Sequence, residues 1–294
     1  MDRETGLNPR QRDLLAWGER HRRDLPWRHT RDPWAVLVSE LMLQQTQVPR
    51  VVPRYEQFME QFPSPAACAA RPAGDVVAAW SGLGYNRRAV NLHRGAVAVC
   101  EHHDGRLPDD LDALLALPGI GPYTARAVLV FAFERDLGLV DTNAGRFVAR
   151  ALVGAPLTRH DAQARADAEV PPGRGWEWGQ TVFDLGATVC TKRDPACERC
   201  PIAPHCAWRR AGYPEPDPIS GSAGISRPQS TFGGSFRQGR GRLLARLTEG
   251  PLDASGVALC AGWPDDPGRA ALAAASLVRD GLAVEDADGS FRLP

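Results

Sequence analysis

The stretch that most constrains the fold is residues 117–143, LPGIGPYTARAVLVFAFERDLGLVDTN. A Pro-Gly-x-Gly turn separates a short amphipathic segment, 111–117, from the apolar run 125–133, and the proline after the turn suits a first helical turn. The pattern predicts a helix, a hairpin turn and a second helix. Gly119 and Gly121 leave their N–H groups uncovered at the positive end of the second helix, so the turn is suited to hold a phosphate. Pro-Gly turns also join helices that have no such role, so this interpretation depends on the rest of the chain.

Length and charge set the limits for that interpretation. A chain of 294 residues is expected to form two or three compact units, each with its own core. No apolar run has membrane length and the N-terminus is polar and charged, so we expect a cytoplasmic protein that does not contact membranes. The net charge is zero, with 8 basic and 10 acidic residues beyond position 210. Any contact with nucleic acid must therefore come from local clusters of charge.

Four of the seven cysteines lie close together, at Cys190, Cys197, Cys200 and Cys206. An odd total without a secretion signal argues against a disulfide framework. Four thiolates at this spacing, with prolines between them, suit an iron–sulfur cluster or a structural zinc, and the spacing alone leaves the metal open. Positively charged residues, Lys192 and Arg193, occupy the first loop of the cluster and favour a position near DNA.

Two carboxylic acids stand out against their surroundings. Glu40 lies in the predicted helix 34–48, WAVLVSELMLQQTQV, with apolar residues on nearly every side. Burial favours the protonated form of a carboxyl, which a general acid requires, although a structural cap or ion pair would also explain it. Asp141 directly precedes the predicted helix 142–152. An ordinary N-cap explains such an Asp, and so does a carboxylate held at a helix N-terminus towards a developing positive charge.

Further polar residues gather at helix junctions. Gln44 and Gln45 end the helix of Glu40 without a periodic reason to be buried. Tyr85 follows two glycines in the sequence GLGY, and Arg87 and Arg88 come directly after it. A tyrosine in this position can enter a base stack while the arginines meet phosphates, but a tyrosine packed over a glycine turn is the simpler alternative.

The composition changes beyond the cysteines. Residues 212–238 are rich in Pro, Ser and Gly and are predicted to be a linker. Residues 239–294 show three helical segments, 241–247, 253–259 and 267–280, followed by a hairpin over 282–293 with Asp-Gly at its turn. This order predicts a winged-helix-like module. Such modules can bind DNA, but this one is net acidic, so a protein contact or a structural role is at least as well supported.

Six motifs occur together in one order: SELMLQQTQ at 39–47, GLGY at 82–85, LPGIGPYTA at 117–125, VDTN at 140–143, DLGATVC at 184–190, and the cysteine spacing. Over roughly residues 10–210 the chain resembles the A/G-specific adenine DNA glycosylases, the MutY family of the helix-hairpin-helix glycosylase superfamily. The resemblance implies a mainly α fold with two helical subdomains around a catalytic cleft, and a [4Fe–4S] cluster rather than zinc. The implied divisions are a catalytic region over 1–211, with a barrel subdomain over 30–135 containing the hairpin and a cluster subdomain formed by 1–29 and 136–211.

The resemblance also implies roles for individual residues. Glu40 would protonate adenine at N7, and Asp141 would stabilise the positively charged sugar. Tyr123 and Asn143 would help to place these groups, and Gln45 and Tyr85 would enter the duplex beside the extruded base. Relatives resembling endonuclease III carry a Schiff-base lysine in the helix after the hairpin, where this chain has tyrosine. A monofunctional glycosylase without strand-cleaving activity is therefore expected.

The chain departs from the family pattern at two places. Asn86 stands where a second aromatic residue often follows the tyrosine, and the segment after the cysteines is too short for the usual hydrolase-like domain that reads 8-oxoguanine. The expected partner is double-stranded DNA with adenine opposite 8-oxoguanine or guanine, bound by a monomer. The alternatives are a mismatch thymine or uracil DNA glycosylase, which Glu40 disfavours, and a non-catalytic iron–sulfur DNA-binding sensor, which has no need of either carboxyl.

Overall fold

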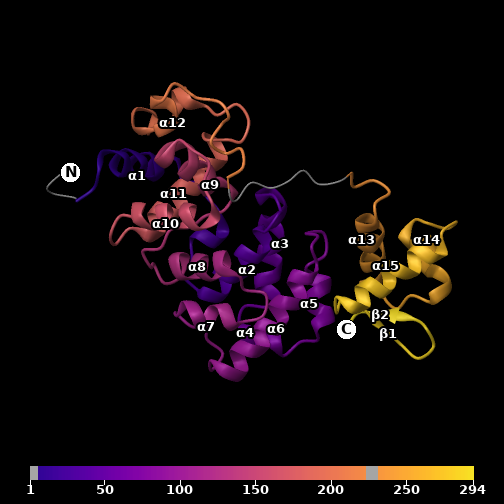
Figure 1. Cartoon of the computed structure of the whole chain (residues 1–294). Coiled ribbons are helices and arrows are strands. Elements are labelled where there is room, and N and C mark those ends of the chain that lie inside the picture. Colours follow the sequence, from indigo (N-terminus) through magenta and orange to yellow (C-terminus); the bar gives the residue numbers. More distant parts are fainter. Residues whose placement is uncertain (1–5, 223–230) are drawn as a thin grey trace. The chain divides into compact units, whose positions relative to one another are not determined.

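The computed structural model describes residues 6–222 and 231–294 and is mainly helical (Figure 1). The helices before the hairpin are α1 (Pro9–His21), α2 (Pro33–Leu43), α3 (Val48–Gln61), α4 (Pro65–Ala69), α5 (Ala73–Ala79), α6 (Arg87–His102) and α7 (Leu111–Ala116). After it come α8 (Pro122–Phe131), α9 (Thr142–Phe147), a π-helical turn η2 (Val148–Val153), α10 (Arg159–Glu169), α11 (Gly175–Thr188) and α12 (Ala207–Arg210). Short 3-10 turns lie at Pro26–Arg28, Cys197–Arg199 and Ala203–His205. No helix within the described ranges is both long and apolar enough to cross a membrane.

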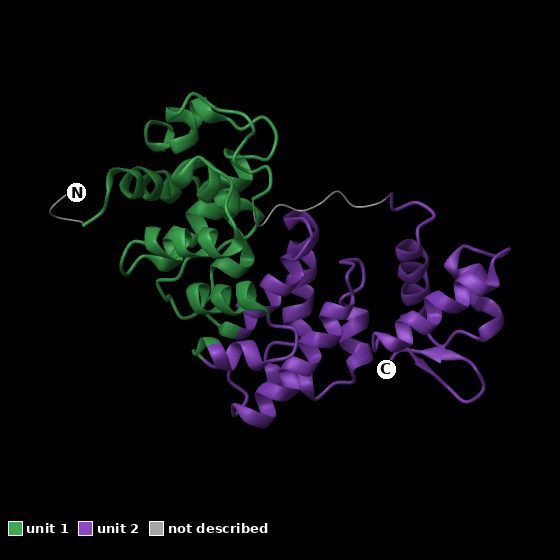
Figure 2. Ribbon diagram, in the orientation of Figure 1, with its two compact units in different colours: residues 1–33, 109–111, 121–227 green, residues 34–108, 112–120, 228–294 purple. Residues whose placement is uncertain are grey.

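The chain divides into two compact units (Figure 2). Unit 1 comprises residues 1–33, 109–111 and 121–227, and unit 2 comprises residues 34–108, 112–120 and 228–294. The N-terminal helix thus shares unit 1 with the cysteine region. Two segments differ from the prediction: α8 belongs to unit 1, and the C-terminal module belongs to unit 2. Contacts far apart in the sequence explain both assignments.

Helix α8 is bound to unit 1 by its polar and aromatic side chains. Arg126 donates to the carbonyl oxygen of Gly138 at 3.0 Å and pairs with Asp167 of α10. At the end of α8, the ring of Phe131 meets the ring of Phe183 of α11 edge-on, with centroids 5.7 Å apart. The hairpin prediction is correct for the order of helix, turn and helix, but its second helix packs on unit 1.

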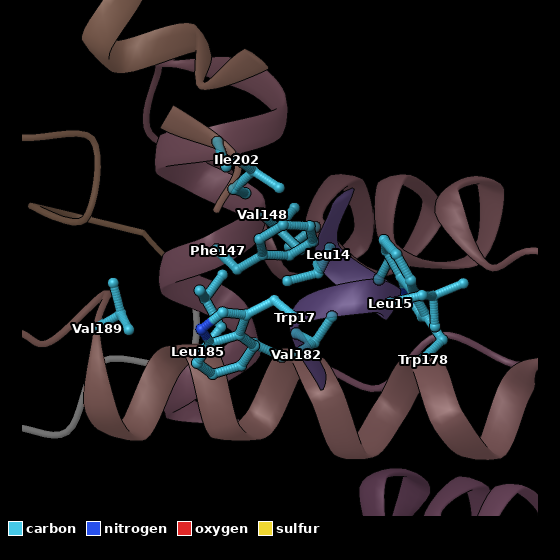
Figure 3. Packing of buried hydrophobic residues seen from close by; sticks show 14 residues of the cluster. Leu14, Leu15, Trp17, Phe147, Val148, Trp178, Val182, Leu185, Val189 and Ile202 are labelled. Atoms are coloured by element: carbon cyan, nitrogen blue, oxygen red, sulfur yellow. The ribbon is translucent and has the colours of Figure 1, made fainter. Parts of the chain in front are cut away.

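The core of unit 1 joins helices from both ends of the unit (Figure 3). Leu14 of α1, Phe147 of α9, and Val182 and Leu185 of α11 lie in one buried cluster, and Ile202 extends it to the cysteine region. Three of the four clustered cysteines pack against this cluster: Cys190, Cys200 and Cys206. The apolar core therefore holds α9, which carries Asp141 at its start, and the cysteine region in one rigid arrangement.

Helix α2 lies in the core of unit 2, and its residues from Trp34 to Met42 are all buried. The predicted helix 34–48 is wrong at its C-terminal end, because α2 stops at Leu43 and α3 starts at Val48. Between the two helices Gln45 has a left-handed backbone with φ of 56°. The proline at position 49 suits the first turn of α3, so the chain starts a new helix there instead of continuing α2.

The C-terminal module consists of α13 (Phe236–Leu247), a 3-10 turn (Ala254–Gly256), α14 (Val257–Ala261), α15 (Pro267–Arg279) and the antiparallel pair β1 (Val284–Glu285) and β2 (Phe291–Arg292). An isolated bridge between Leu252 and Phe291 adds a third extended segment. Three helices and a hairpin match the winged-helix-like prediction. The module contacts the rest of unit 2 through α5, where the N–H of Gly74 donates to the carbonyl oxygen of Pro294 at 2.7 Å.

The boundaries at the start of the module differ from the prediction. Helix α13 begins five residues early, at Phe236, because the hydroxyl of Ser235 accepts from the N–H of Gln238 at 3.2 Å and caps it. The expected linker 212–238 is also shorter than predicted on its other side, since Ile219 is buried with 7% exposure in unit 1. What is left between the two ends includes residues 223–230, which lie outside the described ranges.

Candidate active site and four-cysteine pocket

The hairpin turn has the open geometry that the sequence predicts. Gly119 adopts φ of +79°, and a Cβ there would lie 2.5 Å from the Cβ of Asn91, so both backbone conformation and space require glycine. Gly121 caps α8 without a side-chain hydrogen bond, and a Cβ there would meet nothing within 4 Å. No neighbouring atom therefore crowds Gly121 at the positive end of the α8 dipole.

Glu40 is buried in α2 with 6% exposure and belongs to unit 2. Its neighbours in the helix are apolar except for Ser39, whose hydroxyl donates back to the carbonyl oxygen of Val36 at 2.8 Å. The sequence prediction of a carboxyl in an apolar helix agrees with its burial.

Arg88 has a different environment from the one expected of a phosphate contact. Its side chain is buried, with 8% exposure, and its guanidinium donates to the carbonyl oxygens of Leu41 at 2.5 Å, Gln44 at 2.6 Å and Gly84 at 2.9 Å. It also donates to the hydroxyl of Thr46 at 3.2 Å. Burial lowers the pKa of Arg88 to about 10, which leaves it charged at neutral pH. Arg88 therefore caps the C-terminus of α2, and we revise its predicted role from a DNA contact to a structural one.

The two segments that Arg88 joins both carry predicted DNA-contact residues. One contains Gln44 and Gln45, and the other is the glycine turn before Tyr85, whose side chain is 41% exposed. Gln45 and Tyr85 have left-handed backbones, with φ of 56° and 49°. Such strain in non-glycine residues is unusual and gathers at functional positions. By contrast with Arg88, Arg87 is exposed and lies 3.8 Å from Asp280 of the module.

Asp141 forms the N-cap of α9, as one of the two sequence interpretations requires. Its Oδ1 accepts from the N–H groups of Asn143 at 2.8 Å and Ala144 at 2.7 Å, and its Oδ2 accepts from the amide of Asn143 at 3.0 Å. Burial raises the pKa of Asp141, and the two N–H groups, the charge of Arg146 and the amide of Asn143 oppose this effect without cancelling it. The carboxylate is thus oriented by neutral donors and only partly compensated in charge, so it would strongly stabilise a nearby positive charge.

The sequence analysis did not identify Arg146, whose side chain holds Asn143 in place beside the Asp141 cap. Its guanidinium donates to Asn143 Oδ1 at 2.7 Å and to the carbonyl oxygen of Cys190 at 2.9 Å. The side chain thus connects the Asp141–Asn143 pair with the first cysteine of the cluster. Gly186 permits this approach, because a Cβ there would lie 2.7 Å from the Cβ of Asn143. An arginine among the apolar residues of the segment TNAGRFVARAL was the available signal.

Tyr123 lies in the first turn of α8 and belongs to unit 1 with Asp141. Its ring stacks at 6.5 Å on Phe183 of α11, the helix that also bears Gly186. Tyr123 is thus fixed by packing within the unit that carries the Asp141 cap. Glu40 lies in the other unit, so the predicted pairing of the two carboxyls in one cleft stays a prediction.

The four clustered cysteines line one pocket whose other walls are mostly apolar. Burial raises the pKa of Cys190, Cys200 and Cys206, that of Cys200 to about 12, so thiols in this pocket carry charge when a metal displaces their protons. Within the described residues, no group of three or more His, Cys, Asp or Glu side chains converges as for a single metal ion. The donor set of four thiols around one pocket suits an iron–sulfur cluster or a structural zinc.

Lys192 and Arg193 are both exposed, on the loop that follows Cys190. The loop has a defined shape: the hydroxyl of Thr191 donates to the carbonyl oxygen of Arg193 at 2.7 Å, and Asp194 has φ of 48°. The two basic side chains are therefore presented on a folded loop, as their predicted contact with phosphate requires.

Comparison with known proteins identifies the relatives of this chain. The model of the HhH-GPD superfamily of base excision DNA repair proteins matches residues 38–172. The adenine DNA glycosylase of Mycolicibacterium smegmatis is 41% identical over 285 residues, which cover 96% of this chain and 94% of the relative. That of Mycobacterium tuberculosis is 41% identical over 292 residues, with 96% and 92% covered. The human adenine DNA glycosylase is 37% identical over 223 residues, which cover 71% of this chain and 41% of the human protein.

Solved structures of other proteins align with this chain and support its fold. A thermostable thymine-DNA glycosylase aligns with a TM-score of 0.63 and 29% identity over 68% of this chain and 94% of its own. Endonuclease III trapped covalently on DNA aligns with a TM-score of 0.58 over 71% of this chain, and at 21% identity it supports the fold alone. The alignments with the mycobacterial proteins cover 96% of the chain and so include most of the C-terminal module. By its identity to relatives that it spans almost end to end, the chain belongs to the adenine DNA glycosylase family.

Proposed function

We propose that this protein hydrolyses the N-glycosidic bond of adenine that is paired with 8-oxoguanine or guanine in double-stranded DNA. The supporting observation is a pair of carboxyls in two contrasting environments, in a chain 41% identical to adenine DNA glycosylases over nearly its whole length. Glu40 is buried in an apolar helix, and Asp141 is held by backbone donors at a helix N-terminus. Contrasting environments of two carboxyls are the basis of acid and base roles in glycosidic cleavage.

Glu40 is the proton donor in this proposal. Its carboxyl transfers a proton to N7 of adenine, the glycosidic bonding pair leaves with the neutral base, and positive charge develops on the sugar. Pyrimidines have no N7 acceptor, so this role favours adenine over thymine or uracil. The position of Glu40 in α2, buried from bulk water, supports this role.

Asp141 stabilises the positively charged sugar; water then adds at C1′ and releases a proton to the solvent. Neutral donors fix its oxygens, so the group needs no reorganisation when the charge appears. Asn143 orients the second oxygen of the carboxylate. Tyr123 packs beside this site and cannot form a Schiff base, so the enzyme releases the base without cleaving the strand.

The metal group in this proposal is a [4Fe–4S] cluster held by Cys190, Cys197, Cys200 and Cys206, which line one pocket and supply the four thiolates that such a cluster takes. The cluster serves a structural role in this proposal and takes no part in the hydrolysis. Its ligands fix the loop of Lys192 and Arg193 beside the core of unit 1.

Binding to DNA rests on the loops already described. The N–H groups of the hairpin at Gly119 and Gly121 hold a phosphate, and Arg87, Lys192 and Arg193 contact further phosphates. Gln44, Gln45 and Tyr85 enter the duplex where adenine is extruded, and their two segments are held together by Arg88.

The test is base release from a panel of duplexes carrying A, T or U opposite 8-oxoguanine, guanine or cytosine. We expect release of adenine alone, a loss of about 10²–10⁴-fold in Glu40→Gln, and a loss of about 10²–10³-fold in Asp141→Asn. Asp266→Asn is a matched control, because Asp266 caps α15 by accepting from the N–H of Arg269 at 2.9 Å and Asn caps equally well. Release of thymine or uracil instead, or full activity of both variants, would refute the proposal.

Two further measurements test the proposed mechanism. The raised pKa of Asp141 predicts that the single-turnover rate falls at low pH around a value above that of an ordinary aspartate, because the carboxylate is lost there on protonation. A rate that is unchanged down to the ordinary range of aspartate would contradict this. Borohydride trapping of a covalent complex with DNA would rule out the monofunctional mechanism.

A further inference from the structure

Residues 213–222, which we call the strap, follow α12 and were expected to be part of a linker. The strap is instead fixed to unit 1. The indole N–H of Trp208 donates to the carbonyl oxygen of Pro214 at 3.1 Å, and the hydroxyl of Ser222 accepts from the N–H of Leu157 at 3.1 Å. Ile219 is buried between these two points. A segment held at both ends and in the middle has a defined path, so its polar side chains have fixed positions.

The strap presents Asp217 to Arg150, a residue of η2 with 1% exposure. The two side chains form a bidentate pair, with Arg150 Nε 3.0 Å from Asp217 Oδ1 and Nη2 2.5 Å from Oδ2. The strap itself orients the carboxylate, because the N–H of Ile219 also donates to Oδ1 at 3.0 Å. A buried guanidinium without its carboxylate is costly, so this pair fixes the direction in which Arg150 points.

The remaining donors of Arg150 all go to the loop that starts the cysteine cluster. Nη1 donates to the carbonyl oxygen of Thr191 at 2.7 Å and lies 3.6 Å from the sulfur of Cys190. Nη2 also donates to the carbonyl oxygen of Lys192 at 3.3 Å. The indole of Trp208 closes the remaining side, with its centroid 5.0 Å from the guanidinium carbon. One buried arginine therefore connects the strap to the backbone that carries the exposed Lys192 and Arg193.

We propose that Asp217 is a positioning residue for DNA binding: through Arg150 it fixes the backbone of the cluster loop so that Lys192 and Arg193 meet the phosphates of the duplex. The inference rests on the proposed function only in that DNA is the ligand, and it assigns a role to a strap outside the cysteine motif. Without the Asp217 carboxylate, the loop keeps Lys192 and Arg193. It loses the two hydrogen bonds from Arg150 to backbone carbonyl oxygens that orient these side chains. The expected effects are a lower affinity for DNA and a more mobile loop.

The sign of the effect separates positioning from bulk charge. Removing an acidic side chain from a protein that binds DNA should strengthen binding when only net charge matters. Glu215→Gln is the matched control, because Glu215 is an exposed acidic residue of the same strap; its side chain accepts from the N–H of Asp217 at 3.1 Å, and the amide oxygen of Gln keeps this acceptor while the charge is removed. We expect Glu215→Gln to bind as tightly as the wild type or more tightly. For Asp217→Asn we expect about 5- to 20-fold weaker binding, the effect of losing one or two oriented phosphate contacts.

The experiment measures binding of the full-length, cluster-loaded protein to an undamaged duplex over a series of salt concentrations. The variants are Asp217→Asn, Lys192→Ala with Arg193→Ala, and all three substitutions together. We expect Asp217→Asn to reduce the salt slope by about one to two. In the variant that already lacks Lys192 and Arg193, Asp217→Asn should cause no further loss of affinity for DNA. Wild-type affinity in Asp217→Asn, or an equal loss in the background without the basic residues, would overturn the proposal.

Limited digestion with trypsin gives a readout that does not depend on DNA, since cleavage after Lys192 or Arg193 reports the mobility of the loop. We expect cleavage there to be at least 10-fold faster in Asp217→Asn, and iron content with absorbance of the cluster verifies that loading is equal. Asp217→Glu, which keeps the charge, is expected to be intermediate and serves where Asp217→Asn does not fold. Undamaged DNA makes the result independent of which base is excised. Unchanged cleavage in both variants would refute the positioning role.

Discussion

The adjacent residues Arg87 and Arg88 provide a sharp test, because the sequence assigns them the same role and the structure does not. We predict that Arg88→Met lowers the stability of unit 2, whereas Arg87→Met leaves it nearly unchanged. Arg88 satisfies the carbonyl oxygens of Leu41, Gln44 and Gly84 from a buried position. Methionine fills a similar volume but donates no hydrogen bond.

The magnitude follows from the acceptors left without a donor. Each buried acceptor that loses its partner costs about 1–3 kcal/mol, and water can replace part of the loss at the edge of the site. Two or three acceptors left unsatisfied then give about 3–5 kcal/mol. For a unit of this size, that lowers the melting temperature by about 6–20 °C. Arg87 is exposed, and its contact with Asp280 at 3.8 Å is worth at most about 1 kcal/mol.

The assay compares thermal and urea unfolding of the two variants with binding to an undamaged duplex. Arg87→Met should weaken binding and reduce the salt slope by about one, without a change in melting temperature beyond about 4 °C. Arg88→Lys should recover little, because an ammonium cannot reach acceptors spread over two segments as the planar guanidinium does. The reasoning is refuted when Arg88→Met unfolds like the wild type, and even more clearly when it loses affinity for DNA at unchanged stability.

Two further predictions concern stability elsewhere in the chain. Burial raises the pKa of Asp184, but its hydrogen bonds and charge pairing with two arginines outweigh this and hold the pKa below its usual value. Because the folded state binds this proton less readily than the unfolded state, the ion pairs of Asp184 stabilise the fold above about pH 4, and this stabilisation is lost as the pH falls. Asp184→Asn should lower the free energy of unfolding by about 3–5 kcal/mol at neutral pH, and urea unfolding should show a weaker fall of stability at acid pH. In the C-terminal contact, Gly74→Ala would place a Cβ 2.5 Å from the carbonyl oxygen of Pro294, so we expect a lower melting temperature. Gly241→Ala, in a helix with open space around the new Cβ, should instead stabilise by about 0.5–1 kcal/mol, and a lowered melting temperature there would contradict the packing argument.

Local patterns in the sequence determined the helical fold and the order of its motifs. The hairpin and the N-cap at Asp141 appear where their residues predict them, and the C-terminal module has the predicted order of three helices and a hairpin with helix bounds shifted by a few residues. These features depend on neighbours within a few positions, such as the proline after the hairpin turn or the N–H groups that follow a cap. A single sequence carries that information directly.

Tertiary structure decided the roles of buried polar residues. Arg88 resembles Arg87 in the sequence, but its acceptor at Leu41 lies 47 positions away. Arg150 likewise meets Asp217 across 67 positions, which turns an expected linker into a fixed strap. A charged residue takes its role from the partner that compensates it on burial, and that partner is brought near only when the chain folds. The sequence therefore determined which residues carry charge, and the packing of the helices decided which charges face solvent and which hold the loops in place.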